Sequence, residues 1–145
     1  MRLLLILLIF LFPLSSLSAQ NKVKIDSLTV QLRKTKDPEA KFKLYQELTF
    51  LNESKTKYLN SMLLNAELSG NTELQLSTYR FVTSLPEDIA KGQYYLDKMF
   101  ALAKEKKNQE YQGWYYLYSG TIQHYVKSNS AKAMELAREA NEIGK

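Results

Sequence analysis

Histidine, cysteine and paired carboxylates most often carry catalysis or hold metals, and this chain has few such groups. It has one histidine, His124, and no cysteine. Thiolate nucleophiles, disulfides and cysteine-based zinc sites are therefore excluded. A serine nucleophile would need His124 as its base, but no serine stands nearby in a Gly-x-Ser-x-Gly elbow. We predict no catalytic residue, no metal site and no cofactor.

The charged residues have the pattern of solvated helix surfaces. Glu135 and Glu139 lie four residues apart with Lys132 and Arg138 beside them, as is ordinary on an exposed helix. The densest basic cluster, at 104–107, contains a glutamate and suits a helix C-terminus. Nucleic-acid binding needs a basic stripe on one face, so we predict that nucleic acid is not a partner.

The first twenty residues have the three-part pattern of a secretory signal peptide. Arg2 gives a positive start, an apolar run covers residues 3–12, and small residues follow. A membrane span needs roughly 20 apolar residues, but Pro13 and several serines interrupt this run earlier. We predict a signal peptide at 1–20, cleaved near Ala19 or Gln20. The mature chain is then periplasmic or secreted, with no membrane contact and a net charge of +4 instead of +5.

The rest of the chain predicts about seven helices with short connections. Glycine (5) and proline (3) are scarce, and apolar residues recur every three or four positions. Asp37 and Pro38 suit a helix start, Ser54 suits another, and Gly70 suits a left-handed helix end. The last three helices are expected from about Glu87 to Lys107, Gln109 to Lys127 and Ser130 to Ile143.

An internal repeat is the most specific pattern in the sequence. Shifting the chain by 37 residues aligns apolar or aromatic residues in three successive copies. The aligned sets are Phe42, Tyr79 and Tyr116; Leu44, Phe81 and Tyr118; Leu48, Leu85 and Ile122; Leu59, Leu96 and Ala133; Met62, Met99 and Leu136; Leu63, Phe100 and Ala137; and Ala66, Ala103 and Ala140. One hairpin cannot bury its apolar face alone, whereas stacked copies bury a continuous core. We predict an N-terminal helix at 21–37 and repeats at about 38–71, 72–108 and 109–145; a helical bundle with chance matches is the alternative.

The third copy carries a family resemblance. Its residues are Trp114-Tyr115-Tyr116-Leu117-Tyr118-Ser119-Gly120, then Tyr125, Ala133, Ala137 and Ala140. They resemble the tetratricopeptide repeat (TPR) family, which implies a right-handed α-solenoid over residues 38–145. The period exceeds the family's value of about 34, and the usual proline at the repeat end is missing. The segment around the expected cleavage site also resembles exported proteins of Bacteroidetes-type bacteria.

The TPR resemblance implies a concave binding surface along the first helix of each repeat. The positions that it indicates are Lys43, Glu47, Arg80, Trp114, Leu117, Thr121 and His124. An aromatic ring among cations suits an extended peptide or an acidic chain end. Two alternatives stay open: Trp114 packs in the core or against a neighbouring repeat, and His124 is a passive surface residue.

Three hypotheses about function follow. The first is an exported helical-repeat scaffold that binds a protein or peptide and is not an enzyme. The second, by family analogy, is the N-terminal periplasmic sensor region of a longer membrane-bound signalling or transcription regulator, with further repeats or an output domain beyond Lys145. The third is an enzyme or glycan-binding module, which tight oligosaccharide binding at Trp114 would favour.

Overall fold

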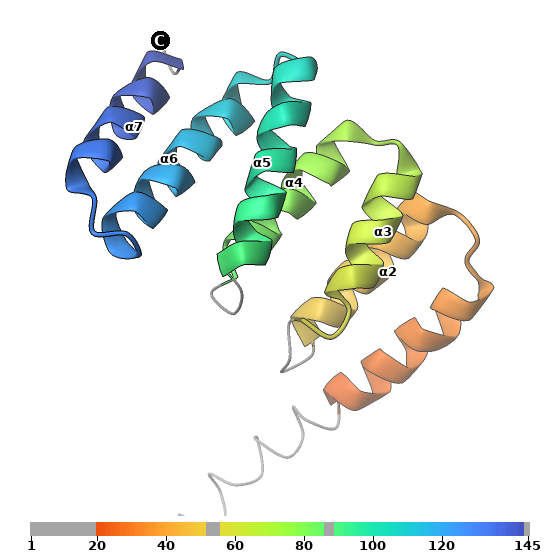
Figure 1. The fold of residues 1–145 in the computed structure, drawn as a ribbon. Helices are drawn as coiled ribbons and strands as arrows, with labels where there is room; N and C mark the ends of the chain where they lie inside the picture. Colours follow the sequence, from red (N-terminus) through yellow and green to blue (C-terminus); the bar gives the residue numbers. More distant parts are fainter. Residues whose placement is uncertain (1–19, 52–55, 86–88, 144–145) are drawn as a thin grey trace, which may run out of the picture. The chain divides into compact units, whose positions relative to one another are not determined.

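The computed structural model describes residues 20–51, 56–85 and 89–143. Within these ranges the chain forms seven helices and no strand, which confirms the all-α prediction (Figure 1). None of the helices in these ranges is both long and apolar enough to cross a membrane. Residues 1–19 of the predicted signal peptide lie outside the described residues. The chain divides into two compact units, with the boundary between Ser69 and Gly70.

The first unit contains a helix at residues 20–34, followed by α2 (Pro38–Leu51) and α3 (Leu59–Ser69). Asp37 caps α2 as predicted, because its Oδ2 accepts a hydrogen bond from the Ala40 N–H at 2.7 Å. Ser54, the predicted cap of the next helix, lies outside the described residues. α2 and α3 pack on each other. Their buried apolar residues are Phe42, Leu48, Leu59, Met62, Leu63 and Ala66.

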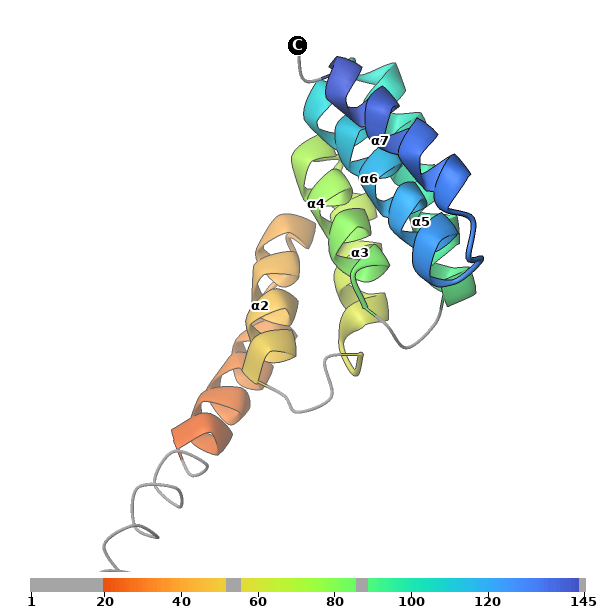
Figure 2. The same cartoon turned by 90° about the vertical axis from the view of Figure 1, so that its left-hand side faces the viewer.

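The second unit contains α4 (Thr72–Thr83), α5 (Ile89–Glu105), α6 (Gln109–Tyr125) and α7 (Ser130–Ile143). α6 and α7 begin at the residues that the sequence predicted. α4 pairs with α5 and α6 pairs with α7, and α6 also contacts both α5 and α4 (Figure 2). The second unit therefore consists of two hairpins, and the first helix of the later hairpin packs on the earlier one.

Two helix starts of the second unit have the same local geometry, 37 residues apart. Gly70 (φ 66) and Lys107 (φ 56) both have left-handed backbone, and an asparagine follows each of them. Asn71 accepts hydrogen bonds from two backbone N–H groups of α4, and Asn108 accepts one from Tyr111. The left-handed residue turns the chain, and the asparagine satisfies free donors of the next helix. The prediction for Gly70 is confirmed, and Lys107 adopts the same conformation with a full side chain.

Close contacts join α6 to α5 and to α7. The rings of Phe100 on α5 and Tyr115 on α6 stack, with centroids 3.9 Å apart and planes 14° apart. Gly120 is buried against α7, where a Cβ would lie 3.4 Å from the Ala133 carbonyl oxygen. The absence of a side chain at Gly120 therefore lets α6 and α7 approach each other closely.

Burial is uneven between the two hairpins. Leu76, Leu96, Met99 and Ala103 of α4 and α5 are each 0% exposed. No residue of α7, which the structure describes throughout, is buried. The repeat pattern led us to expect buried residues there, but Ala133, Leu136 and Ala140 are half-buried and Ala137 is exposed. α7 packs on α6 alone among the described helices, and one helix neighbour cannot enclose its apolar face.

Candidate functional site

Arg80 of α4 lies against the first half of α6. Its Cζ is 4.9 Å from the ring centroid of Trp114 and 5.8 Å from that of Tyr111. Its Nη1 lies 3.6 Å from Oε1 of Glu110, whose side chain is 69% exposed. Because the guanidinium and its partners are partly solvated, the three contacts contribute only about 0.5 kcal/mol in total. Together they hold a half-buried indole and a guanidinium side by side at the surface.

Tyr111, a buried residue, makes a partly buried polar contact next to this pair. Its hydroxyl donates a hydrogen bond to Oε1 of Glu73 at 2.6 Å, and the residue is only 3% exposed. Burial raises the pKa of Tyr111 well above its ordinary value, and the hydrogen bond to Glu73 raises it further. The phenol therefore stays protonated near neutral pH and ties α6 to α4.

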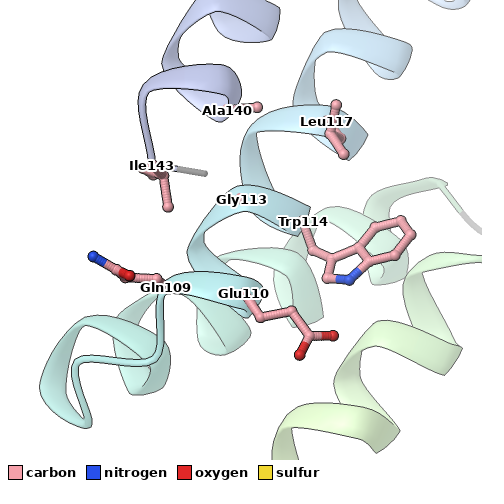
Figure 3. A pocket seen from close by; sticks show the side chains of 7 residues that line it. All are labelled: Gln109, Glu110, Gly113, Trp114, Leu117, Ala140 and Ile143. Carbon is pink, nitrogen blue, oxygen red and sulfur yellow. The ribbon is translucent and has the colours of Figure 1, made fainter. Parts of the chain in front are cut away.

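A pocket of about 390 Å³ opens between the start of α6 and the end of α7 (Figure 3). It is lined by Gln109, Glu110, Gly113, Trp114 and Leu117 of α6 and by Ala140 and Ile143 of α7. A Cβ on Gly113 would meet no described atom within 4 Å, so the missing side chain leaves room in the pocket. The lining combines apolar groups with the Gln109 amide and the Glu110 carboxylate, which suits an apolar group that carries a hydrogen-bond donor.

The structure brings three of the predicted site residues together. Arg80 packs on Trp114, and both Trp114 and Leu117 line the pocket. Leu117 is 49% exposed, so its apolar surface is open to a partner. Trp114 is half-buried and is partly covered by Arg80 and by the ring of Tyr118, whose centroid lies 5.7 Å away. Trp114 therefore has one side packed against neighbouring side chains and one side lining the pocket.

Thr121 and His124 lie further along α6, outside the pocket lining. The Thr121 hydroxyl donates to the Leu117 carbonyl within its own helix at 3.0 Å. The Nδ1 atom of His124 lies 3.1 Å from the Ser130 hydroxyl oxygen, and its ring meets that of Tyr125 edge-on. Both residues are exposed. Their polar groups serve the local structure of α6 and of the connection to α7.

Lys43 and Glu47 belong to the first unit, on α2. Lys43 pairs with Glu39 one turn earlier at 3.3 Å, with both side chains largely exposed. Glu47 pairs with Lys24 at 3.3 Å and so links α2 to the helix at 20–34. Surface ion pairs of this kind contribute about 0–1 kcal/mol. These two residues therefore stabilise the first unit locally, and the candidate site consists of residues of the second unit.

Several residues of the site were not predicted from the sequence. Glu110, Gly113, Ala140 and Ile143 line the pocket, and Tyr111 binds Glu73 from 38 positions away. One signal was present, because the shift of 37 residues that aligns the apolar columns also aligns Glu73 with Glu110. This column is polar, so it lies outside the apolar pattern that defines the repeat.

The site offers groups for recognition: an indole, a guanidinium, a carboxylate and apolar walls. Among residues 20–51, 56–85 and 89–143, no three histidine, cysteine or acidic side chains gather closely enough to hold a metal ion. No protein family, no curated protein and no solved structure matches the chain. Its function is therefore inferred from the geometry described above.

Proposed function

We propose that the chain is an exported helical-repeat scaffold that binds a protein or peptide and performs no catalysis. The observation that carries this proposal is the contact of Arg80 with Trp114 beside an open, partly apolar pocket. Tryptophan and arginine supply a large share of the binding energy in protein interfaces, above all where a pocket adjoins them. A partner at this place meets a positioned indole, a cation and the exposed side of Leu117.

We further propose that residues 38–145 form a right-handed α-solenoid of about three TPR-like repeats behind the N-terminal helix. The repeated cap geometry at Asn71 and Asn108 supports a period of 37 residues. So does the burial of Ala66 and Ala103, one period apart and both 0% exposed. Small residues at such positions allow close helix packing, and a larger side chain would overpack the contact.

Trp114 is the only tryptophan, so its fluorescence reports on this site alone. The test compares proteins cross-linked and captured by the wild type, by Trp114→Ala and by Tyr94→Ala, quantified by mass spectrometry. Tyr94 on α5 is 56% exposed and lies outside the pocket lining, which makes it a matched aromatic control. A partner of this site should be captured about tenfold less by Trp114→Ala, as for an interface hot spot, and equally by Tyr94→Ala.

Circular dichroism of all three proteins keeps loss of folding apart from loss of binding. A captured protein that also quenches or shifts the Trp114 emission of the wild type would support the proposal directly. Identical capture by the wild type and Trp114→Ala, with unchanged tryptophan emission, would contradict it.

Export is tested by fractionation and N-terminal sequencing. Protein recovered outside the cytoplasm should begin near Asn21, after removal of the segment that ends at Ala19 or Gln20. Protein that stays in the cytoplasm and still begins at Met1 would contradict the export proposal without affecting the binding proposal.

A further inference from the structure

The α6–α7 hairpin repeats the α4–α5 hairpin with the same register. A shift of 37 residues places Glu110 on Glu73, Gly113 on Leu76 and Ala140 on Ala103. Glu110, Gly113 and Ala140 all line the pocket. The pocket is therefore the counterpart of a surface on α4–α5 whose occupant the structure shows.

That occupant is α6 itself. The hydroxyl of Tyr111 donates to Glu73 at 2.6 Å, and Nε2 of Gln112 donates to the Ala103 carbonyl at 3.2 Å. With α6 in place, Leu76 and Ala103 are each 0% exposed. The first turn of α6, with Tyr111 followed by Gln112, thus covers this surface of α4–α5 and supplies a donor to the Glu73 carboxylate.

The same surface on α6–α7 is open. Gly113 and Ala140 are only half-buried, whereas their counterparts Leu76 and Ala103 are 0% exposed. The Glu110 side chain is 69% exposed and can be reached by a donor. Glycine stands where α4 has Leu76, so the pocket is wider than its counterpart by one leucine side chain. Ala140 stands where α5 has Ala103, whose carbonyl accepts from the Asn108 N–H as well as from Gln112. A carbonyl at this position can therefore accept a hydrogen bond from a side chain of another helix.

We propose that this surface docks an amphipathic helix of a partner protein that carries the pattern of α6. Its tyrosine enters the pocket and donates a hydrogen bond to Glu110, and its apolar stripe covers Leu117, Ala140 and Ile143. The following amide side chain donates to the carbonyl of Ala140. This inference rests on the proposed binding function and names the chemical class of the partner.

The probe is a synthetic peptide with the sequence of residues 108–127, blocked at both ends and labelled with a fluorophore. Its binding to the full chain is measured by fluorescence anisotropy. A second peptide replaces the tyrosine that corresponds to Tyr111 by phenylalanine, which removes only the hydroxyl. We expect the wild-type protein to bind the tyrosine peptide about tenfold more tightly, the lower value for one hydrogen bond to a carboxylate.

Two protein variants place the binding on the pocket. Ile143→Arg puts a charge into the lining and should weaken binding at least tenfold. Met134→Arg makes the same kind of change at a 60% exposed position of α7 outside the lining, and should change affinity less than twofold. Glu110→Ala should abolish the preference for tyrosine over phenylalanine, because the acceptor of the hydroxyl is gone.

Equal binding by the wild type and Ile143→Arg would overturn the inference, because the peptide would then replace α6 on α4–α5 or bind elsewhere. Absence of binding would overturn it as well. Either result, together with partners that are still captured through Trp114, would leave the proposed function standing. Absence of Trp114-dependent capture alongside peptide binding at the pocket would contradict the role of Trp114 in the proposed function and keep the helix site.

Discussion

The two hairpins of the second unit carry matching residues, but they differ in burial. Leu96, Met99 and Ala103 of α5 are 0% exposed, whereas their counterparts Ala133, Leu136 and Ala140 of α7 are half-buried. α5 packs between α4 and α6, and α7 packs on α6 alone. In these two hairpins, an apolar column is fully buried where helices pack on both sides of it, as on α5, and it stays half-buried where one helix packs on it.

Shortening one side chain of the same apolar column in each hairpin should show the largest difference in stability between them. Met99→Ala should lower the free energy of unfolding by about 2–5 kcal/mol, because the side chain is fully buried. Leu136→Ala, at the matching position of α7, should cost about 1 kcal/mol, because its side chain is half-buried. Urea unfolding followed by circular dichroism measures both. Equal losses would mean that α7 is as well covered in solution as α5.

Loss of the hydrogen bond between Tyr111 of α6 and Glu73 of α4 should have the next largest effect on stability. Tyr111→Phe should cost about 2 kcal/mol, since it removes a hydrogen bond to a carboxylate and leaves Glu73 without that donor. Glu110→Gln, at the matching position of the open hairpin, should cost about 0.5 kcal/mol or less because that side chain is exposed. A Tyr111→Phe variant as stable as the wild type would show that the hydroxyl does not hold α6 in place.

This contact also predicts a dependence on pH. The folded-state pKa of Tyr111 is raised above its ordinary value of about 10. Its contribution to stability is therefore complete below pH 10 and is lost as the pH rises above it, when the unfolded chain ionises. Unfolding of the wild type and Tyr111→Phe at pH 8 and pH 11 should give free energies that converge at the higher pH. A constant difference would contradict the assignment.

The two glycines of α6 should respond in opposite directions. Gly113→Ala should raise stability by about 0.5–1 kcal/mol, because glycine weakens a helix interior and the new Cβ meets no described atom within 4 Å. Gly120→Ala should bring no gain or a loss, because its Cβ would lie 3.4 Å from the Ala133 carbonyl oxygen. Thermal unfolding of both variants measures this contrast. A gain at Gly120 would mean that α7 moves away from α6 easily.

The smallest effect should come from the cation on the indole. Arg80→Leu gives α4 the residue that α6 has at the matching position, Leu117. The loss should be about 0.5 kcal/mol, since the guanidinium is partly solvated. The emission of Trp114 should shift at the same time, because the cation 4.9 Å from the ring centroid is gone. Unchanged emission would show that Arg80 does not rest on the ring in solution.

The sequence was sufficient for the helices and for several of their ends. Asp37 and Gly70 have local effects, since a cap side chain or a left-handed backbone depends on a few neighbouring residues. Gly120 belongs to the segment that resembles the TPR family, and in the structure it lies where α6 packs closely on α7. Such features can be predicted because their physical cause lies within one or two turns of helix.

The candidate site was predicted only in part. Arg80, Trp114 and Leu117 lie together, but Lys43 and Glu47 form ion pairs within the first unit. Those pairings depend on side-chain reach at an exposed surface, where many arrangements have nearly equal energy. The bond between Tyr111 and Glu73 spans 38 residues, and no local pattern encodes which carboxylate a buried phenol meets.

The joints before α4 and α6 have a consequence for how such a chain changes in evolution. Each joint consists of one left-handed residue and one capping asparagine, and both act on backbone within a few positions. Tandem duplication or deletion of a whole 37-residue segment would therefore leave the left-handed residue and the capping asparagine of each joint in place. A lineage that carries this chain can lengthen or shorten it by complete hairpins without redesigning the turns between them.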